Sequence, residues 1–282
     1  MIKTLDLDKL FDAYISDYVY KNVGKVKPEE IENNIPVLYE RFGDEKLKEL
    51  DGKTPNTYYR GASAKELLSV LKEHIEKKIS VSDFLCEAII AAKDGADACV
   101  KALNAEEPEE SEEFTAYLMN MLSDMKAEIP AERYFEFALY DYPDSVGELA
   151  TEFLCEIADK VKSGAIARYK DADERGKARI AEILSRTKRV PGEDAVFDVL
   201  VAEFLKHGEN VPLYASYLAR YGDERALPFL NAAVENVKLN YADFEELRFA
   251  IEALGGECNV KRDFSADRTY KKIKGESRKI VK

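Results

Sequence analysis

The chain has 282 residues, of which 46% are hydrophobic and 34% are charged, and its formal net charge is −13. This composition is typical of a globular protein with many amphipathic helices, and it excludes a largely disordered body. No apolar run approaches the roughly 18 residues that a membrane span requires. Asp6 and Asp8 interrupt the region where a signal peptide would be apolar, so we expect a cytoplasmic protein without a transmembrane segment.

The charge is distributed unevenly along the chain. Residues 259–282 contain nine Lys or Arg against three acidic residues, a local charge of +6, which leaves residues 1–258 at −19. A body this acidic repels phosphate backbones, so we do not expect it to bind nucleic acid. This electrostatic repulsion does not apply to the basic tail.

Apolar residues recur at helical intervals from the start of the chain. The first predicted helix carries a stripe from Leu7 to Tyr18, and the second opens at Pro28, where we expect Pro36 to break it in two. Ser63 begins a capping-box pattern that opens the next helix. Further helices are predicted at residues 82–92, 96–103, 114–125 and 134–139.

The second half of the chain continues this pattern. Ser145 and Glu148 form another capping-box pattern, and the apolar residues from Leu149 through Ile157 to Val161 make the longest stripe in the chain. Helices near residues 174–186, 193–206, 212–221, 224–236 and 241–254 complete the body.

The connections between these helices are short and contain Gly, Pro, Asp or Asn. Short links favour antiparallel neighbours, and about a dozen such helices cannot share one bundle core. The sequence therefore predicts an all-α protein in which helical hairpins are stacked side by side.

A repeat is visible in the second half. Amphipathic helices end on Leu184, Leu218 and Leu254, at intervals of 34 and 36 residues, and this period is typical of helical-hairpin solenoids. Between two of these helices, Gly222 is predicted to end one helix in the left-handed conformation, and Asp223 to cap the next.

The segment GDERALPFL, residues 222–230, resembles the inter-helix turn and second-helix start of HEAT-like repeats, and LRFAIEALGG, residues 247–256, resembles their first helix. DADER, residues 171–175, is a weaker match, so the resemblance covers residues 165–256 best. It implies an all-α, right-handed superhelical stack of antiparallel hairpins, a HEAT-like α-solenoid. We expect an N-terminal helical cap at 1–61, repeats at 62–257 and a basic tail at 258–282.

Motifs that could carry chemistry are few. DGKTP, residues 51–55, contains the end of a phosphate-binding loop, but Leu47 stands where the first glycine is required, so Thr54 is better interpreted as a helix cap. The two histidines, His74 and His207, have no His-Glu neighbour of the kind found in HEAT-like di-iron hydroxylases. Three of the four cysteines lie in helical patterns and are interpreted as reduced core residues. We predict no catalytic residue, metal site or cofactor.

Two charged segments leave alternatives open. The acidic run at residues 106–113 is interpreted as a solvated loop, or as a docking strip for a basic peptide or a divalent ion. The basic tail is disordered, folds back on the acidic body, or binds nucleic acid or a membrane surface.

The function that we expect is non-catalytic: a repeat scaffold that binds a protein or peptide partner, with a basic one favoured by an acidic concave surface. The location of the binding residues is not determined by the sequence. The resemblance also implies an enzymatic alternative, either an alkylated-base DNA glycosylase or a phycobilin-type lyase. Such glycosylases use a basic groove and aromatic residues, often tryptophan, whereas this body is acidic and the chain has no tryptophan.

Overall fold

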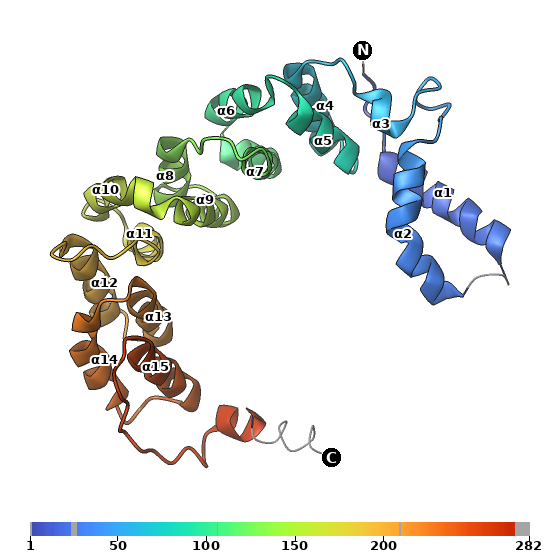
Figure 1. Cartoon of the computed structure of the whole chain (residues 1–282). Helices are drawn as coiled ribbons and strands as arrows, with labels where there is room; N and C mark the ends of the chain where they lie inside the picture. The colour runs from blue at the N-terminus through green and yellow to red at the C-terminus, as the bar shows by residue number, and fades with distance from the viewer. Residues whose placement is uncertain (1, 24–26, 106, 209, 274–282) are drawn as a thin grey trace. The chain divides into compact units, whose positions relative to one another are not determined.

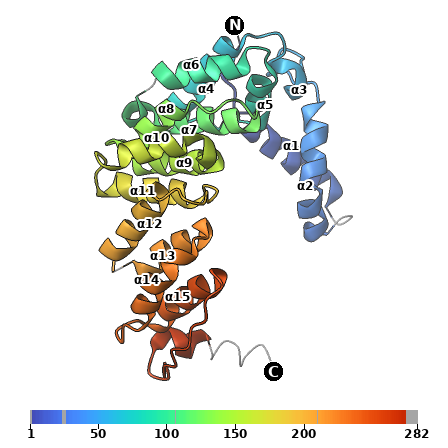
Figure 2. The same cartoon turned by 60° about the vertical axis from the view of Figure 1, so that its left-hand side comes forward.

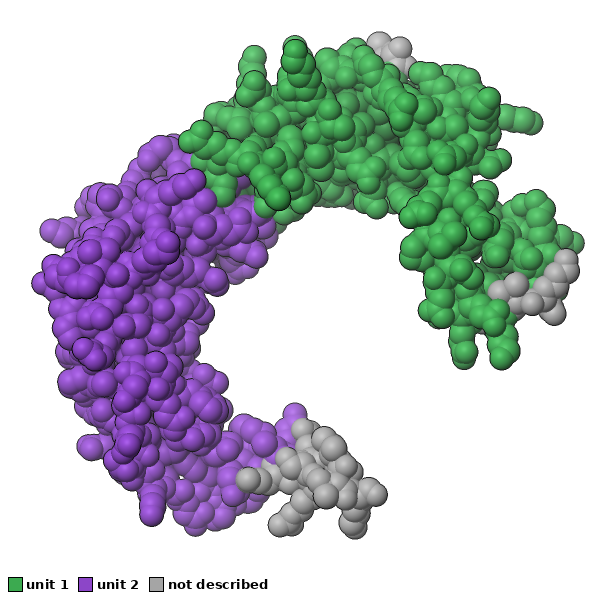
Figure 3. All heavy atoms as spheres, viewed as in Figure 1, with its two compact units in different colours: residues 1–130 green, residues 131–282 purple. Residues whose placement is uncertain are grey.

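A computed structural model of the chain describes residues 2–23, 27–105, 107–208 and 210–273. These residues form α1 to α15, one short 3-10 helix and a last helical segment at residues 268–273, and no β-strand occurs among them, so the fold is all-α as predicted. The chain divides into two compact units, residues 1–130 and residues 131–282 (Figure 3). The finer division at residues 61 and 257 stays a prediction. Within the described part of the chain, none of the helices combines the length and the apolar character needed to cross a membrane.

Unit 1 contains seven helices in which neighbours along the chain pack on one another. The aromatic side chains of the first two helices meet those of α5: the ring centroids of Phe11 and Phe42 lie 5.3 Å apart, and those of Tyr39 and Phe84 lie 5.0 Å apart. This cluster fixes residues 1–61 against the helices that follow them, because aromatic rings bury large apolar areas. The helices are α1 (Leu7–Asn22), α2 (Pro28–Gly43), α3 (Pro55–Tyr58), α4 (Ala64–Glu76), α5 (Asp83–Ala91), α6 (Gly95–Ala105) and α7 (Pro108–Asp124).

In unit 2, the helices α8 to α15 are arranged in two rows (Figures 1 and 2), and a further helical segment follows at residues 268–273. Along one row, α9 packs on α11, α11 on α13, and α13 on α15, while α8, α10, α12 and α14 each pack on the following helix. The period of 34 to 36 residues therefore corresponds to one step along this row. The helices are α8 (Ala131–Leu139), α9 (Asp144–Glu156), α10 (Ala158–Tyr169), α11 (Glu174–Ser185), α12 (Ala195–Lys206), α13 (Val211–Tyr221), η1 (Glu224–Ala226), α14 (Leu227–Val234) and α15 (Tyr241–Ala253).

The turn at Gly222 has the predicted geometry. Gly222 adopts φ +78° and ψ +28°, and its N–H donates to the Leu218 carbonyl. The next residue, Asp223, caps the 3-10 helix η1 by accepting a hydrogen bond from the N–H of Arg225. The pairing differs from the prediction in one respect: α14 packs on α15, and α13 on α12 and α15, so this turn joins neighbouring pairs instead of lying inside one pair.

Three local predictions are wrong. α2 runs through Pro36 without ending, because an internal proline removes one backbone hydrogen bond but does not prevent helical φ and ψ on both sides. The capping box at Ser145 does not form, since α9 already begins at Asp144 without a side-chain cap. The apolar stripe from Leu149 to Val161 spans two helices, because Ile157 leaves the helical region at φ −111° and ψ +24°. The capping box at Ser63 is confirmed.

The first part of the basic tail is folded onto unit 2. Arg262 donates to the carbonyls of Val234 and Asn236 at the end of α14, at 3.1 and 2.8 Å. The ring of Phe264 lies edge-on to that of Tyr241, with centroids 5.3 Å apart. Residues 258–273 therefore cover the end of the helix rows. Residues 258–273 are thus ordered, contrary to one of the predictions for the tail, and residues 274–282 lie outside the described part of the chain. Binding of nucleic acid or a membrane by the tail stays a prediction.

Candidate functional site

A cleft of about 490 Å³ lies on unit 2 between α9 and α11. The sequence of α9 places Glu148, Glu152 and Glu156 one turn apart on one helix face, because side chains four residues apart are neighbours on a helix. We call the following set of lining residues the glutamate cleft: Glu148, Thr151, Glu152, Cys155, Glu156, Arg179, Glu182 and Arg186.

The glutamate cleft is acidic in effect. Arg179 lines it, but its guanidinium is directed to other partners: it donates to the Ala138 carbonyl at 3.0 Å and to a carboxylate oxygen of Asp144 at 3.2 Å. In the described part of the chain, none of the four glutamates has an ion-pair partner within 4.0 Å. Four carboxylates are thus opposed by two arginines, Arg179 and Arg186, so the lining carries a net negative charge that favours a cationic ligand.

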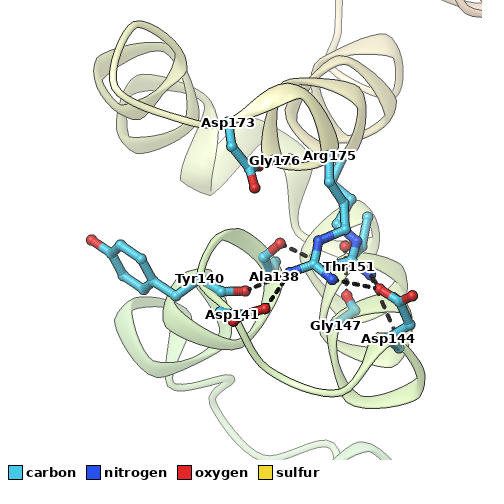
Figure 4. A network of polar contacts seen from close by, with 10 residues as sticks. Ala138, Tyr140, Asp141, Asp144, Gly147, Thr151, Asp173, Arg175 and Gly176 are labelled. Atoms are coloured by element: carbon cyan, nitrogen blue, oxygen red, sulfur yellow. Dashed lines mark hydrogen bonds and ion pairs between the residues drawn. The ribbon is translucent and has the colours of Figure 1, made fainter.

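One end of the cleft is built from a network of polar contacts between α11 and the turn that joins α8 to α9 (Figure 4). Arg175 donates to Asp144 at 2.8 Å and to the Tyr140 carbonyl at 3.0 Å. Arg179, one turn further along α11, is only 8% exposed and passes directly over Gly147. A Cβ atom at Gly147 would lie 2.3 Å from the Arg179 Nη1 atom, so the absence of a side chain there makes room for the arginine.

Burial lowers the pKa of the Arg179 guanidinium. Desolvation, followed by repulsion from Arg175, lowers its pKa from the ordinary 12.5, and Asp144 opposes this effect. Arginine stays charged under such conditions, so unit 2 contains a nearly buried cation whose hydrogen bonds must all be kept.

Cys155 lies at the base of the cleft and is not a candidate nucleophile. Burial raises the pKa of its thiol to about 12, and burial likewise raises the pKa values of Cys86 and Cys99 to about 11. All four cysteines are free thiols. Cys99 and Cys155 are buried, as the interpretation as core residues requires, whereas Cys86 is only half-buried. The raised pKa values disfavour the thiolate, which is the reactive form.

Thiol labelling is expected to be selective. At pH 8, Cys258 should react with a disulfide reagent, whereas Cys86, Cys99 and Cys155 should stay unmodified until the protein unfolds, because burial suppresses their thiolate forms. Mass spectrometry of the labelled peptides measures this directly. The Cys258→Ser variant serves as the control and should show almost no fast reaction; fast labelling of Cys155 in either protein would contradict the assignment.

The two histidines occupy structural positions. His74 is 1% exposed, and its ring nitrogens lie 2.8 Å from the Val70 carbonyl and 3.1 Å from the Leu5 carbonyl, so the ring ties α4 to the N-terminal segment. His207 follows α12, as predicted, and lies 3.1 Å from a carboxylate oxygen of Glu203.

Glu203 is a buried carboxylate that sequence reasoning did not single out. It is 1% exposed and accepts a hydrogen bond from the Tyr169 hydroxyl at 2.6 Å, while the ring of His207 stacks on Tyr214 with centroids 4.8 Å apart. These contacts join α10, α12 and α13. Because the cluster joins helices of both rows through hydrogen bonds and ring stacking, we assign it a structural role in holding the two rows together.

We expect the protein to be sensitive to alkali, because the pKa values of several tyrosines are raised in the fold. Burial raises the pKa values of Tyr169 and Tyr217 above the ordinary 10, and for Tyr169 the hydrogen bond to Glu203 adds to this rise. Tyrosines of the unfolded chain ionise at about pH 10, whereas these tyrosines keep their protons in the folded protein. Their contribution to the free energy of unfolding is therefore fully present below about pH 10 and is lost as the pH rises further.

The expected result is that phenolate absorbance and loss of helical circular dichroism rise together for this buried set above about pH 10. The Tyr217→Phe variant should lose less of its stability between neutral and alkaline pH than the parent. Tyr20, which is 80% exposed, provides the control, and Tyr20→Phe should not change the profile. Independent ionisation of all tyrosines without unfolding would refute the prediction.

The remaining motifs form no site. Thr54 caps the short helix α3, and its N–H donates to the Thr57 hydroxyl at 3.2 Å, so DGKTP is a helix start and not a phosphate loop. The prediction of a solvated loop at the acidic run 106–113 is wrong for residues 108–113, which form the first turns of α7, while residue 106 lies outside the described residues. Among the residues that the structure describes, no three His, Cys, Asp or Glu side chains are grouped so that they could hold a metal ion.

In comparisons with known proteins, no family model, no curated protein and no solved structure matches this chain.

Proposed function

We propose that the chain is a HEAT-like repeat protein, a right-handed superhelical stack of antiparallel hairpins, that binds a protein or peptide partner without catalysis. The spacing of buried residues supports the repeat. Leu184 and Leu218, 34 residues apart, are both buried near the C-terminal ends of α11 and α13, which pack on each other in one row.

The observation that carries the proposed binding role is the glutamate cleft. It lies on the row formed by α9, α11, α13 and α15, which in a solenoid of this kind lines the concave side. Its carboxylates have no ion-pair partner among the described residues, and such a surface attracts and orients a basic partner.

The spacing of the glutamates defines the partner more closely. Residues four apart on a helix are separated by about 6 Å along its axis. Alternate residues of an extended peptide lie about 6.6 Å apart on the same side of the chain. Glu148, Glu152 and Glu156 therefore match an extended segment with Lys or Arg at every second position.

Charge removal in the cleft tests the proposal. The probe is a fluorescein-labelled octapeptide that alternates Lys and Ser, and its binding is followed by fluorescence anisotropy. The triple variant E148Q, E152Q, E156Q should bind this peptide about tenfold more weakly than the parent protein, because each lost contact removes a fraction of a kcal/mol.

The matched control is E224Q, E235Q, E257Q, which changes the net charge equally at exposed positions of the same unit. It should alter the affinity less than about twofold, since distant surface charges are screened at about 150 mM salt. Equal weakening by both triple variants would reduce the binding to general attraction by an acidic protein. In that case the cleft is not the binding site.

A further inference from the structure

A second cavity, of about 550 Å³, lies entirely within unit 1, between α4 and α6 and above Phe114 of α7. Its walls are two helix faces: α4 contributes two lysines, and α6 contributes a third lysine among small apolar side chains. We call the following set the lysine groove: Lys65, Leu68, Ser69, Lys72, Asp94, Asp97, Ala98, Lys101, Ala102, Ala105 and Phe114.

The lysine groove is elongated. Lys65 and Lys72 are seven residues apart on α4, and Ala98 and Ala105 are seven residues apart on α6. Seven helical residues span about 10 Å, so both walls extend for two turns. Phe114 and Leu68 form the floor and are 3% and 6% exposed.

The groove is a cationic exception on an acidic unit. Residues 1–130 contain 17 Lys and Arg against 27 Asp and Glu, a net charge of −10, whereas the groove contains three lysines and two aspartates. Asp94 and Asp97 lie at the N-terminal end of α6, where the helix dipole compensates negative charge. The Nζ atom of Lys72 is 5.6 Å from the centre of the Phe114 ring, so its charge lies over the apolar floor.

The shape and the hydrogen-bonding groups of the groove favour a helical ligand. An extended peptide would need acceptors for its backbone N–H groups along its whole length. The lining offers carboxylate oxygens only from Asp94 and Asp97 at one end of α6, and the Ser69 hydroxyl donates to the Lys65 carbonyl. A helix satisfies its own backbone and can approach closely along Ala98, Ala102 and Ala105. A single-headed amphiphile has only one anionic group, whereas Lys65 and Lys101 lie on opposite walls of the groove.

We propose that the lysine groove binds an acidic amphipathic helix of a partner protein. The apolar side of that helix packs on Leu68, Phe114 and the alanines of α6. Carboxylates along its edge face Lys65 and Lys101. This site is separate from the glutamate cleft. The lysine groove prefers an acidic partner, whereas the glutamate cleft prefers a basic one.

The test uses a fluorescein-labelled synthetic peptide of about four helical turns with leucines on one side and glutamates along one edge. It should bind the full chain saturably, and a scrambled peptide of the same composition should bind at least about tenfold more weakly. The variant K65E, K101E should weaken binding about tenfold or more, because it replaces two attractions by two repulsions. Filling the groove by Ala102→Trp should also abolish binding, without any change in charge.

The matched control is K46E, K48E, which reverses two exposed lysines outside the groove on the same unit, and it should retain affinity within about twofold. Circular dichroism confirms that each variant is folded. No saturable binding at about 100 µM peptide overturns the proposal, as does an equal loss in both charge-reversed variants. Oleate that binds in a Lys65-dependent manner while the helical peptide does not would assign the groove to small anionic amphiphiles instead.

Discussion

The Arg179→Ala variant is expected to be less stable than the parent by about 3 kcal/mol, because nearly buried hydrogen bonds to a charged group are lost together. Arg179 donates to the carbonyls of Ala138 and Asp144 and to the Asp144 carboxylate. Without it, the Ala138 carbonyl is left without its partner at the end of α8. Arg175→Ala should cost only about 1 kcal/mol, since its side chain is 35% exposed and water replaces its contacts.

Gly147 provides the partner for a double-mutant cycle. Gly147→Ala alone should destabilise by about 2 kcal/mol, because the new Cβ would lie 2.3 Å from the guanidinium and would displace it. In the Arg179→Ala background the same change should stabilise by up to about 1 kcal/mol, because alanine is the better helix former. The effect of one methyl group is thus expected to change sign, a coupling that contact residues can show.

Urea unfolding of the four proteins gives the free energies, and hydrogen exchange of the α9 amides shows whether the loss is local to this turn. Additive effects of the two substitutions would mean that Gly147 does not make room for Arg179. The position of the Arg179 side chain against the turn between α8 and α9 would then need another explanation.

Much of unit 2 was predictable because each helix has its own local signals. Between residues 174 and 254, apolar stripes and capping residues agree, as at Asp173, Gly222 and Asp223. The predicted ends there differ from the observed ones by a few residues at most, except that the helix predicted at 224–236 begins as a 3-10 helix and ends at Val234. Local propensity and tertiary packing favour the same structure in this region.

The errors arose where a local signal was ambiguous. The break at Ile157 interrupts an apolar stripe whose period continues into α10, so periodicity alone cannot detect it. Pro36 was expected to end a helix, but whether a helix ends or continues at a proline depends on packing that the sequence does not specify.

The glutamate cleft could not be predicted because its residues are ordinary in sequence terms. With 55 acidic residues in the chain, the row from Glu148 to Glu156 resembles any solvated helix face. The available signal was Gly147, because a glycine inside a helix lowers helix stability and usually has a packing reason. The sequence pattern places Gly147 within the predicted capping box from Ser145 to Glu148. In the structure, the Arg179 side chain occupies the space that a side chain at position 147 would fill.

The Asp-Glu-Arg motif that carries the HEAT-like resemblance occurs in two environments. Asp173 caps α11 by accepting from the Gly176 N–H at 2.7 Å, and it is exposed to solvent. Asp223 is 1% exposed, accepts from Arg225 at 2.8 Å and lies 3.3 Å from the Arg189 Nε atom. The same residue type at the same motif position is therefore a surface cap in one place and a buried ionic anchor in the other.

Asp223→Ala is expected to lower the free energy of unfolding by about 3 kcal/mol, because it removes a cap and the buried acceptor of two arginines, whereas Asp173→Ala should cost about 1 kcal/mol for its cap alone. The hydrogen bonds from Arg225, together with Arg189, lower the pKa of Asp223 below its ordinary 3.8. This stabilisation is complete above the ordinary value and is lost as the pH falls through the lowered one, so the difference between parent and Asp223→Asn should narrow below about pH 4. Urea unfolding at several pH values measures both effects. Equal losses for the two alanine variants would show that burial adds nothing to the Asp223 cap, and the turn at Gly222 would then be held by its backbone conformation alone.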